Sequence, residues 1–111
     1  MRSFIEDWAL GGNRGAAAPI VSDTIDARVL ASNTAERHTS PTGALFVSFS
    51  ATGDFYALFG TSGVTAAVPG SDVTDGTASE LNPNARRIPD GVTHISLIAP
   101  EATVVTLAFW K

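Results

Sequence analysis

Short runs of alternating apolar and polar residues restrict the fold of this chain more than any other feature of its sequence. Residues 45–59 hold two such runs on either side of a turn at 51–54, and residues 94–109 hold two more around Pro100-Glu101. Alternation with a period of two is the pattern of a β-strand that buries one face. Two runs across a short turn are typical of a hairpin, so we predict one β-hairpin in each segment.

The rest of the chain divides into weaker strands and loops. Residues 19–31 alternate in part and predict a half-exposed strand or two short ones, and residues 64–68 predict a further short strand. Residues 32–43 and 69–91 are rich in Gly, Pro and small polar side chains, which is the composition of loops. Seven or eight short strands without a long helix predict an all-β single domain, an antiparallel β-sandwich or barrel that is jelly-roll-like.

The apolar positions of the alternating runs are the predicted core. They share one face of each strand, and a domain built from two packed layers has to bury such a face. The set consists of Leu45, Val47, Phe49, Phe55, Phe59, Ile95, Leu97, Val105, Leu107 and Phe109.

Composition sets further limits. The chain has 111 residues, the size of one domain, and it has no cysteine, which excludes disulfides and thiolate metal sites. No run approaches the ~18 apolar residues of a membrane span, and a net charge of −4 argues against a nucleic-acid partner. Only 16% of the residues are charged, against about 25% in typical domains. This suits a surface in contact with other proteins, and equally a domain rich in neutral Ser, Thr and Gly.

The N-terminal residues predict an arm that precedes the β-domain. Ser3 and Glu6 have the spacing of a helix capping box, so residues 1–18 predict a short helical arm and a linker, with the β-domain in 19–111. The arm is rich in large apolar side chains, which are candidates for an interface: Phe4, Ile5, Trp8 and Leu10. Two interpretations are open, in which the arm packs on its own domain or docks on a neighbouring chain.

Arg86 and Arg87 form an adjacent basic pair and are the remaining interface candidates. Prolines on both sides stiffen their segment. In one interpretation they pair with Glu80 or Asp90 on the surface, where an ion pair stabilises by less than about 1 kcal/mol. In the other they reach a carboxylate of another chain, which the bidentate geometry of arginine favours.

No catalytic or metal-binding constellation is evident in the sequence. His38 lies in a polar segment and His94 on the predicted outer face of a strand, and no serine has the Gly-x-Ser-x-Gly surroundings of a hydrolase nucleophile. The acidic residues of the 69–91 loop lack the ordered spacing of an EF-hand and are expected to form turns. We therefore expect a protein that binds or builds, not an enzyme, with no cofactor and no metal.

Two stretches resemble a known class of proteins. Residues 50–60 (SATGDFYALFG) and 79–99 (SELNPNARRIPDGVTHISLIA), continuing into 104–110 (VVTLAFW), are similar to short proteins encoded among the structural genes of tailed phages and prophages of proteobacteria. The nearest functional class is the capsid decoration, or cement, proteins. The similarity covers the C-terminal half of the chain well and the N-terminal half poorly. The class has no shared catalytic residues to carry over.

The resemblance implies a function and a location. A decoration protein binds the major capsid protein and stabilises its shell, at the capsid surface of a virion that is assembled in the host cytoplasm. Neither nucleic acid nor membrane is an implied partner, whereas a homo-oligomer is, with a trimer favoured. Many weak contacts repeated by symmetry can hold such a protein in place through avidity.

Two other functions are open. A tail, neck or fibre module of the phage would bind another virion protein or a host glycan, and Tyr56 and Trp110 are the aromatic candidates for contact with a sugar. A small cupin-like enzyme would need histidine and carboxylate ligands clustered around a metal, and the two histidines of this chain are far apart in the sequence.

Overall fold

The computed structural model describes residues 1–4 and 19–111. This part of the chain is all β and holds no helix, so no helix in it could cross a membrane. Its strands are, in chain order, β1 (Thr24–Leu30), β2 (Glu36–Thr39), β3 (Phe46–Ala51), β4 (Tyr56–Gly60), β5 (Glu80–Leu81), β6 (Ala85–Arg87), β7 (His94–Ile98) and β8 (Thr103–Trp110).

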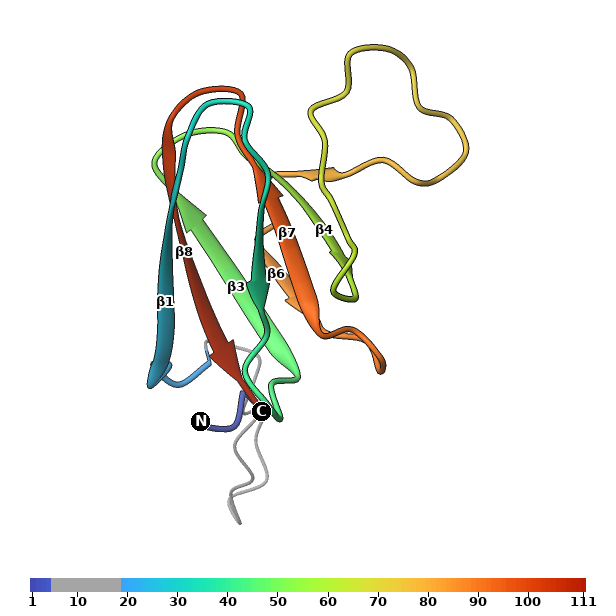
Figure 1. The fold of residues 1–111 in the computed structure, drawn as a ribbon. Helices are drawn as coiled ribbons and strands as arrows, with labels where there is room; N and C mark the ends of the chain where they lie inside the picture. The colour runs from blue at the N-terminus through green and yellow to red at the C-terminus, as the bar shows by residue number, and fades with distance from the viewer. Residues whose placement is uncertain (5–18) are drawn as a thin grey trace.

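The strands form two antiparallel four-stranded sheets, in the orders β1-β8-β3-β6 and β2-β7-β4-β5. Figure 1 shows the two sheets facing each other, with both chain ends at the same end of the domain. Most connections cross from one sheet to the other. Among strands that follow each other in the chain, only β4 and β5 pair within the described residues.

The two predicted hairpins are wrong, although their strands exist. β3 pairs with β8 and β6, whereas β4 pairs with β7 and β5, so residues 52–55 lead from one sheet to the other. β7 and β8 likewise belong to different sheets. Packed sheets lie about 10 Å apart, a distance that a short connection can span. Alternation identifies a strand with one buried face, but it does not identify the partner of that strand.

The hydrophobic core lies between the sheets and takes side chains from both. Eight of the ten predicted core residues are buried, Phe59 is partly buried, and Leu45 is 43% exposed. Leu45 lies just before the first residue of β3, so the alternating pattern in the sequence begins one residue before the strand that enters the core. The largest fully buried apolar side chains are Leu30, Val47, Ile95, Leu97, Val105, Leu107 and Phe109.

Three strands lie in segments whose composition predicts loops. β2 occupies part of residues 32–43, and β5 and β6 lie within residues 69–91. These strands are short and polar, and they form because each adds to a sheet whose other strands are specified by their apolar faces. The predicted strand at 64–68 is wrong. Ala66 instead donates its N–H to the hydroxyl oxygen of Ser96 in β7 at 2.7 Å, and both residues are buried.

The first residues of the chain lie beside its last one. Phe4 donates its N–H to the carbonyl of Lys111 at 2.9 Å, and Lys111 donates its own N–H to the carbonyl of Arg2 at 3.0 Å. The amino group of Met1 forms a salt bridge with Asp23 at 3.7 Å. The expected helical arm and linker span residues 1–18, of which the structure describes residues 1–4, and residues 5–18 lie outside the described residues.

Candidate interaction surfaces

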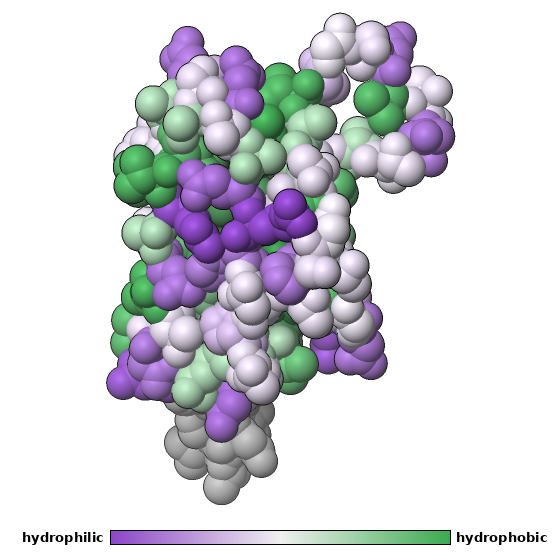
Figure 2. Space-filling view, in the orientation of Figure 1, coloured by the Kyte–Doolittle hydropathy of each residue, from purple (hydrophilic) through white to green (hydrophobic). Residues whose placement is uncertain are grey.

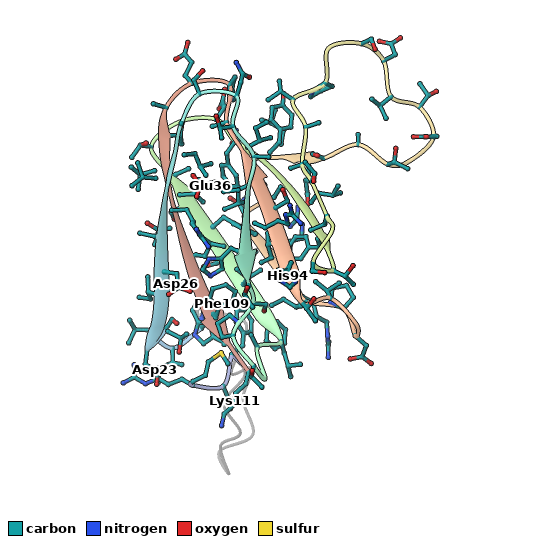
Figure 3. All side chains as sticks on the ribbon, in the orientation of Figure 1. Asp23, Asp26, Glu36, His94, Phe109 and Lys111 are labelled. Carbon is teal, nitrogen blue, oxygen red and sulfur yellow. The ribbon has the colours of Figure 1, made fainter. Side chains whose placement is uncertain are left out.

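Charged side chains close the open side between the sheets at the edge strands β1 and β2. His38 of β2 lies between two residues of β1: its Nε2 is 2.7 Å from Asp26 Oδ2, and its Nδ1 is 3.0 Å from Arg28 Nε. The same guanidinium contacts Glu36 Oε1 at 3.4 Å and donates to the carbonyl of Arg37 at 3.1 Å. Figure 3 shows Asp26 and Glu36 on this side of the molecule, and Figure 2 shows the hydrophilic band that crosses it.

Hydrogen bonding fixes the proton on the His38 ring. Arg28 Nε can only donate, so His38 Nδ1 accepts, and Nε2 carries the proton that it donates to Asp26. The ring also stacks on Phe109, with centroids 5.8 Å apart. Both ring nitrogens are thus engaged by residues of β1. The sequence predicted a loop at His38, whereas this residue lies in β2, and its side chain is 11% exposed and stacks on Phe109 of the core.

A second ion pair closes the opposite open side, where β5 and β6 are the edge strands. Arg86 donates from Nε to Glu80 Oε1 at 3.0 Å, and its Nη2 contacts the other carboxylate oxygen. These hydrogen bonds lower the pKa of the Glu80 carboxyl and raise the pKa of the Arg86 guanidinium. Of the two interpretations of Arg86, the structure shows the ion pair with Glu80 on the surface of its own chain. A contact of Arg86 with another chain remains a proposal.

Candidate residues from distant parts of the sequence meet at one hollow, the arginine–phenylalanine hollow. Phe4, Arg86 and Arg87 line this space of about 290 Å³ together with Phe46 and Ala85. Phe4 stacks on Phe46 with ring centroids 4.5 Å apart, and the Arg87 guanidinium lies 5.5 Å from the centre of the Phe46 ring. Aromatic and arginine side chains are enriched at protein interfaces. The other arm candidates lie outside the described residues: Ile5, Trp8 and Leu10.

The outer face of the β1-β8-β3-β6 sheet is apolar along β1. Ile25 is 54% exposed and Val29 is 73% exposed. Val104 of β8 lies opposite Val29 and is exposed as well, and Figure 2 shows hydrophobic atoms along this edge of the molecule. The charged side chains of β1 contact β2 and so point the other way. β1 therefore turns its apolar side to solvent, the reverse of the usual pattern of a surface strand.

A polar hollow lies where β3 leads into β4. It has a volume of about 460 Å³ and is lined by residues 49–55 and 82–84. Asn82 orders this region, because its side-chain oxygen accepts the N–H of Phe55 at 3.0 Å and its amide donates to Asp54 at 2.9 Å. Amide and carboxylate groups of this kind can hydrogen-bond a polar ligand. Within residues 1–4 and 19–111, no group of three or more His, Asp or Glu side chains is placed to hold a metal ion.

The aromatic residues expected to contact a sugar differ in their surroundings. Trp110 is 5% exposed, and its Nε1 donates to the carbonyl of Ile20 at 2.8 Å. Its ring also meets Phe4 edge-on, with centroids 5.4 Å apart. The expectation that Trp110 offers an exposed face is therefore wrong, because the N-terminal residues cover it. Tyr56 is half-buried in β4.

Residues 61–67 follow β4 and pack on the domain through the buried Ala66, and residues 68–78 form a loop that stands away from both sheets, as Figure 1 shows between β4 and β5. Ala67 donates its N–H to the hydroxyl oxygen of Ser79 at 3.1 Å, which closes the neck of the loop. Within the loop, the Thr77 hydroxyl donates to Asp75 at 2.6 Å and lowers the pKa of that carboxyl. Asp75 thus forms a turn, as the sequence predicted, and the loop exposes Val73 to solvent.

Comparison with known proteins gives no match: no protein-family model matches the chain, and no curated protein or solved structure is significantly similar to it. The function therefore has to be inferred from the surfaces of the domain itself. They comprise two sides closed by ion pairs, an apolar sheet face, the arginine–phenylalanine hollow, a polar hollow and a projecting loop.

Proposed function

We propose that this chain is a structural protein of a tailed-phage virion, specifically a capsid decoration protein that binds and stabilises the shell of major capsid protein. The observation that carries the proposal is the outer face of β1, which presents Ile25 and Val29 to solvent while its charged residues point inward. Exposed apolar groups gain free energy when a partner buries them. The resemblance of residues 50–60, 79–99 and 104–110 to virion proteins supports a capsid protein as that partner.

A jelly-roll sandwich is the fold that we propose for the two sheets. Strands in the orders β1-β8-β3-β6 and β2-β7-β4-β5, with connections that cross between the sheets, support this assignment. Jelly rolls occur in viral capsid domains, in lectins and in cupins. Because one fold hosts several functions, the function has to be inferred from the surfaces of the domain and not from its fold.

The proposed capsid contact extends from the apolar face of β1 to the arginine–phenylalanine hollow. Phe46 of β3 precedes the buried Val47, so its side chain is on the outer face of the same sheet as Ile25 and Val29. Phe4 and Arg87 pack on its ring. A shell repeats each contact with its own symmetry, so individually weak contacts of this kind can hold the protein through avidity.

The proposed partners are the major capsid protein and further copies of the chain, with a trimer implied by the resemblance. A net charge of −4 gives no reason to propose a nucleic-acid partner, and neither a membrane nor an enzymatic reaction is proposed. A chain without cysteine suits assembly in the reducing host cytoplasm. After assembly, the proposed location is the surface of the capsid.

A tail, neck or fibre module is the second candidate function, and the polar hollow of about 460 Å³ favours it. The side chains of Asp54, Asn82 and Asn84 at this hollow are of the kind that hydrogen-bond sugar hydroxyls. The ligand would then be a host glycan or another virion protein. The projecting loop at 68–78 would enlarge the contact.

Gel filtration with purified empty capsids of the phage whose genome encodes the chain separates the two candidates. We expect the chain to co-elute saturably with capsids and to pass through a column of immobilised host glycans without retention. Arg87→Glu should weaken capsid binding, because it reverses the charge beside Phe46. Arg37→Glu, on β2 of the other sheet, is the matched control and should leave binding unchanged. Elution of the chain at its own volume beside capsids, with retention on glycans, would overturn the capsid proposal.

A further inference from the structure

β1 is an edge strand, and within the described residues its second edge has no partner. All of its seven residues pair with β8, from Thr24 opposite Phe109 to Leu30 opposite Thr103. The other edge strands are shorter, with four residues in β2, two in β5 and three in β6. The outer edge of β1 thus presents the longest row of unpaired backbone N–H and C=O groups, which is a template for pairing with another strand.

β1 carries one of the features that block such pairing, a pair of inward-pointing charged residues, Asp26 and Arg28, but side chains of β2 already engage both of them. Edge strands are commonly protected by lysine, proline or a bulge, and residues 24–30 (TIDARVL) contain neither lysine nor proline and pair with β8 without a break in register. Ile25, Ala27 and Val29 on the outer face are exposed. A long, exposed, apolar edge of this kind predicts association with another β-edge.

The sequence of β1 is also complementary to itself about Ala27. In an antiparallel pair of β1 strands centred on Ala27, Asp26 of one copy faces Arg28 of the other, and Ile25 faces Val29. The charged pairs lie on the inner face and the apolar pairs on the outer face, because successive residues alternate in direction. Cross-strand pairs of opposite charge and pairs of β-branched residues both stabilise an antiparallel sheet.

The directly neighbouring registers lack this match. In a pair of strands centred on Asp26, the two Asp26 carboxylates face each other. In a pair centred on Arg28, the two guanidinium groups face each other. Like charges directly opposite each other destabilise both of these registers. In the register centred on Ala27, each charged residue keeps its partner on β2 and gains another. The side chains have room for this, because Asp26 is 41% exposed and Arg28 is 33% exposed.

We propose that two copies of the chain associate through β1, antiparallel about a two-fold axis at Ala27, so that their four-stranded sheets join into one sheet of eight strands. A two-fold contact uses the same surface on both copies and closes on itself. The apolar outer faces of both copies then form one continuous surface. The sequence of β1 favours a two-fold dimer, whereas the resemblance implies a trimer. The dimer is expected to form without a capsid, so it can be tested separately from capsid binding.

Sedimentation equilibrium of the full chain tests the pairing. The wild-type chain should be a dimer, and Val29→Lys should raise the dimer dissociation constant about tenfold, because two symmetry-related contacts are lost. Adding Ile25→Glu to Val29→Lys should restore association, since the introduced carboxylate of one copy faces the introduced amine of the other. Val73→Lys, at an exposed apolar position on the projecting loop, is the matched control and should have no effect.

A single cysteine tests the register, because the chain has no cysteine of its own. Ala27→Cys should give a disulfide-linked dimer on mild oxidation, since directly opposite Cα atoms lie roughly 4.5–5.5 Å apart, within the range of a disulfide. Ile25→Cys should not, because the two copies of that residue are then roughly 13 Å apart along the strands. The proposal is overturned if the chain is a monomer at every concentration, or if it is a trimer that Val29→Lys does not disturb. It is also overturned if the double variant does not recover association, or if cross-linking occurs at Ile25→Cys and not at Ala27→Cys.

Discussion

Asp26 of β1 and His38 of β2 lie 2.7 Å apart, Oδ2 to Nε2, and they join the two sheets across one open side of the domain. Glu80 of β5 and Arg86 of β6 form the corresponding contact across the other side. Charged side chains are thus engaged at the sides of the domain, while the outer face of β1 is left apolar. This division of the surface underlies both the proposed capsid contact and the proposed pairing of two copies.

The first prediction concerns the histidine at this junction. His38→Ala should lower the free energy of unfolding by about 1–3 kcal/mol, because Asp26 and Arg28 each lose a hydrogen-bond partner in a partly buried place. His94→Ala is the matched control, because that ring hydrogen-bonds the adjacent Thr93, and it should change stability by less than about 0.5 kcal/mol. Urea denaturation followed by circular dichroism measures both. Equal losses in the two variants would contradict this role of His38.

The second prediction concerns pH. Glu80→Gln should cost up to about 1 kcal/mol at pH 7, because the pair that it breaks with Arg86 is exposed to solvent. The hydrogen bond from Arg86 lowers the pKa of Glu80 in the folded state, so the stabilisation is fully present above the ordinary pKa of 4.5. It is lost as the pH falls through the lower pKa of the folded state. Urea denaturation of both proteins at neutral pH and in strong acid checks this, and a difference that persists in acid would argue against it.

Alternation in the sequence was sufficient to find the strands that build the core and not sufficient to pair them. Val47 and Phe49 of β3 and Val105 and Leu107 of β8 are buried as predicted. The connection between β3 and β4 looks like a hairpin turn, because a short polar segment with a glycine can either reverse a strand within its sheet or cross to the facing sheet. The choice depends on strands elsewhere in the chain, which the local pattern does not contain.

The sequence was least informative at the edges of the sheets. β2 has no apolar alternation, and it becomes a strand because β7 offers it an edge. β1 does alternate, yet its apolar face points outward, because its charged residues are held by His38 and Glu36 of β2. The hollow where Phe4 meets Arg86 and Arg87 also depends on contacts between distant parts of the chain, so it could not be predicted from the sequence. A contact between distant segments leaves no signal in a single sequence.

The third prediction tests the core. Phe55→Ala should lower the free energy of unfolding by about 3–5 kcal/mol, because it leaves a cavity. The Phe55 side chain is 2% exposed and packs on Phe49, with ring centroids 5.7 Å apart. Leu45→Ala, at a position that is 43% exposed, should cost less than about 1 kcal/mol. Urea unfolding midpoints compare the two, and a loss for Leu45→Ala as large as that for Phe55→Ala would show that the core is wrongly assigned.

The fourth prediction concerns the N-terminal residues. Removal of residues 1–12 should leave the domain folded, because the buried apolar residues of the described part of the chain lie between Leu30 and Trp110. The truncated chain should nevertheless lose capsid binding, because Phe4 no longer packs on Phe46 at the arginine–phenylalanine hollow. Circular dichroism reports the fold, and gel filtration with empty capsids reports binding. Unfolding of the truncated chain, or unchanged binding, would refute the role of these residues as an anchor.

The position of the chain in the virion tests the central claim most directly. The measurement is a cryo-electron microscopy reconstruction of the phage whose genome encodes this chain. The proposal predicts density for a two-sheet domain on the outside of the shell, repeated with the symmetry of the capsid and touching the major capsid protein through the face that carries Ile25 and Val29. Density for the domain in the tail or neck, or a particle that lacks the chain, would contradict it.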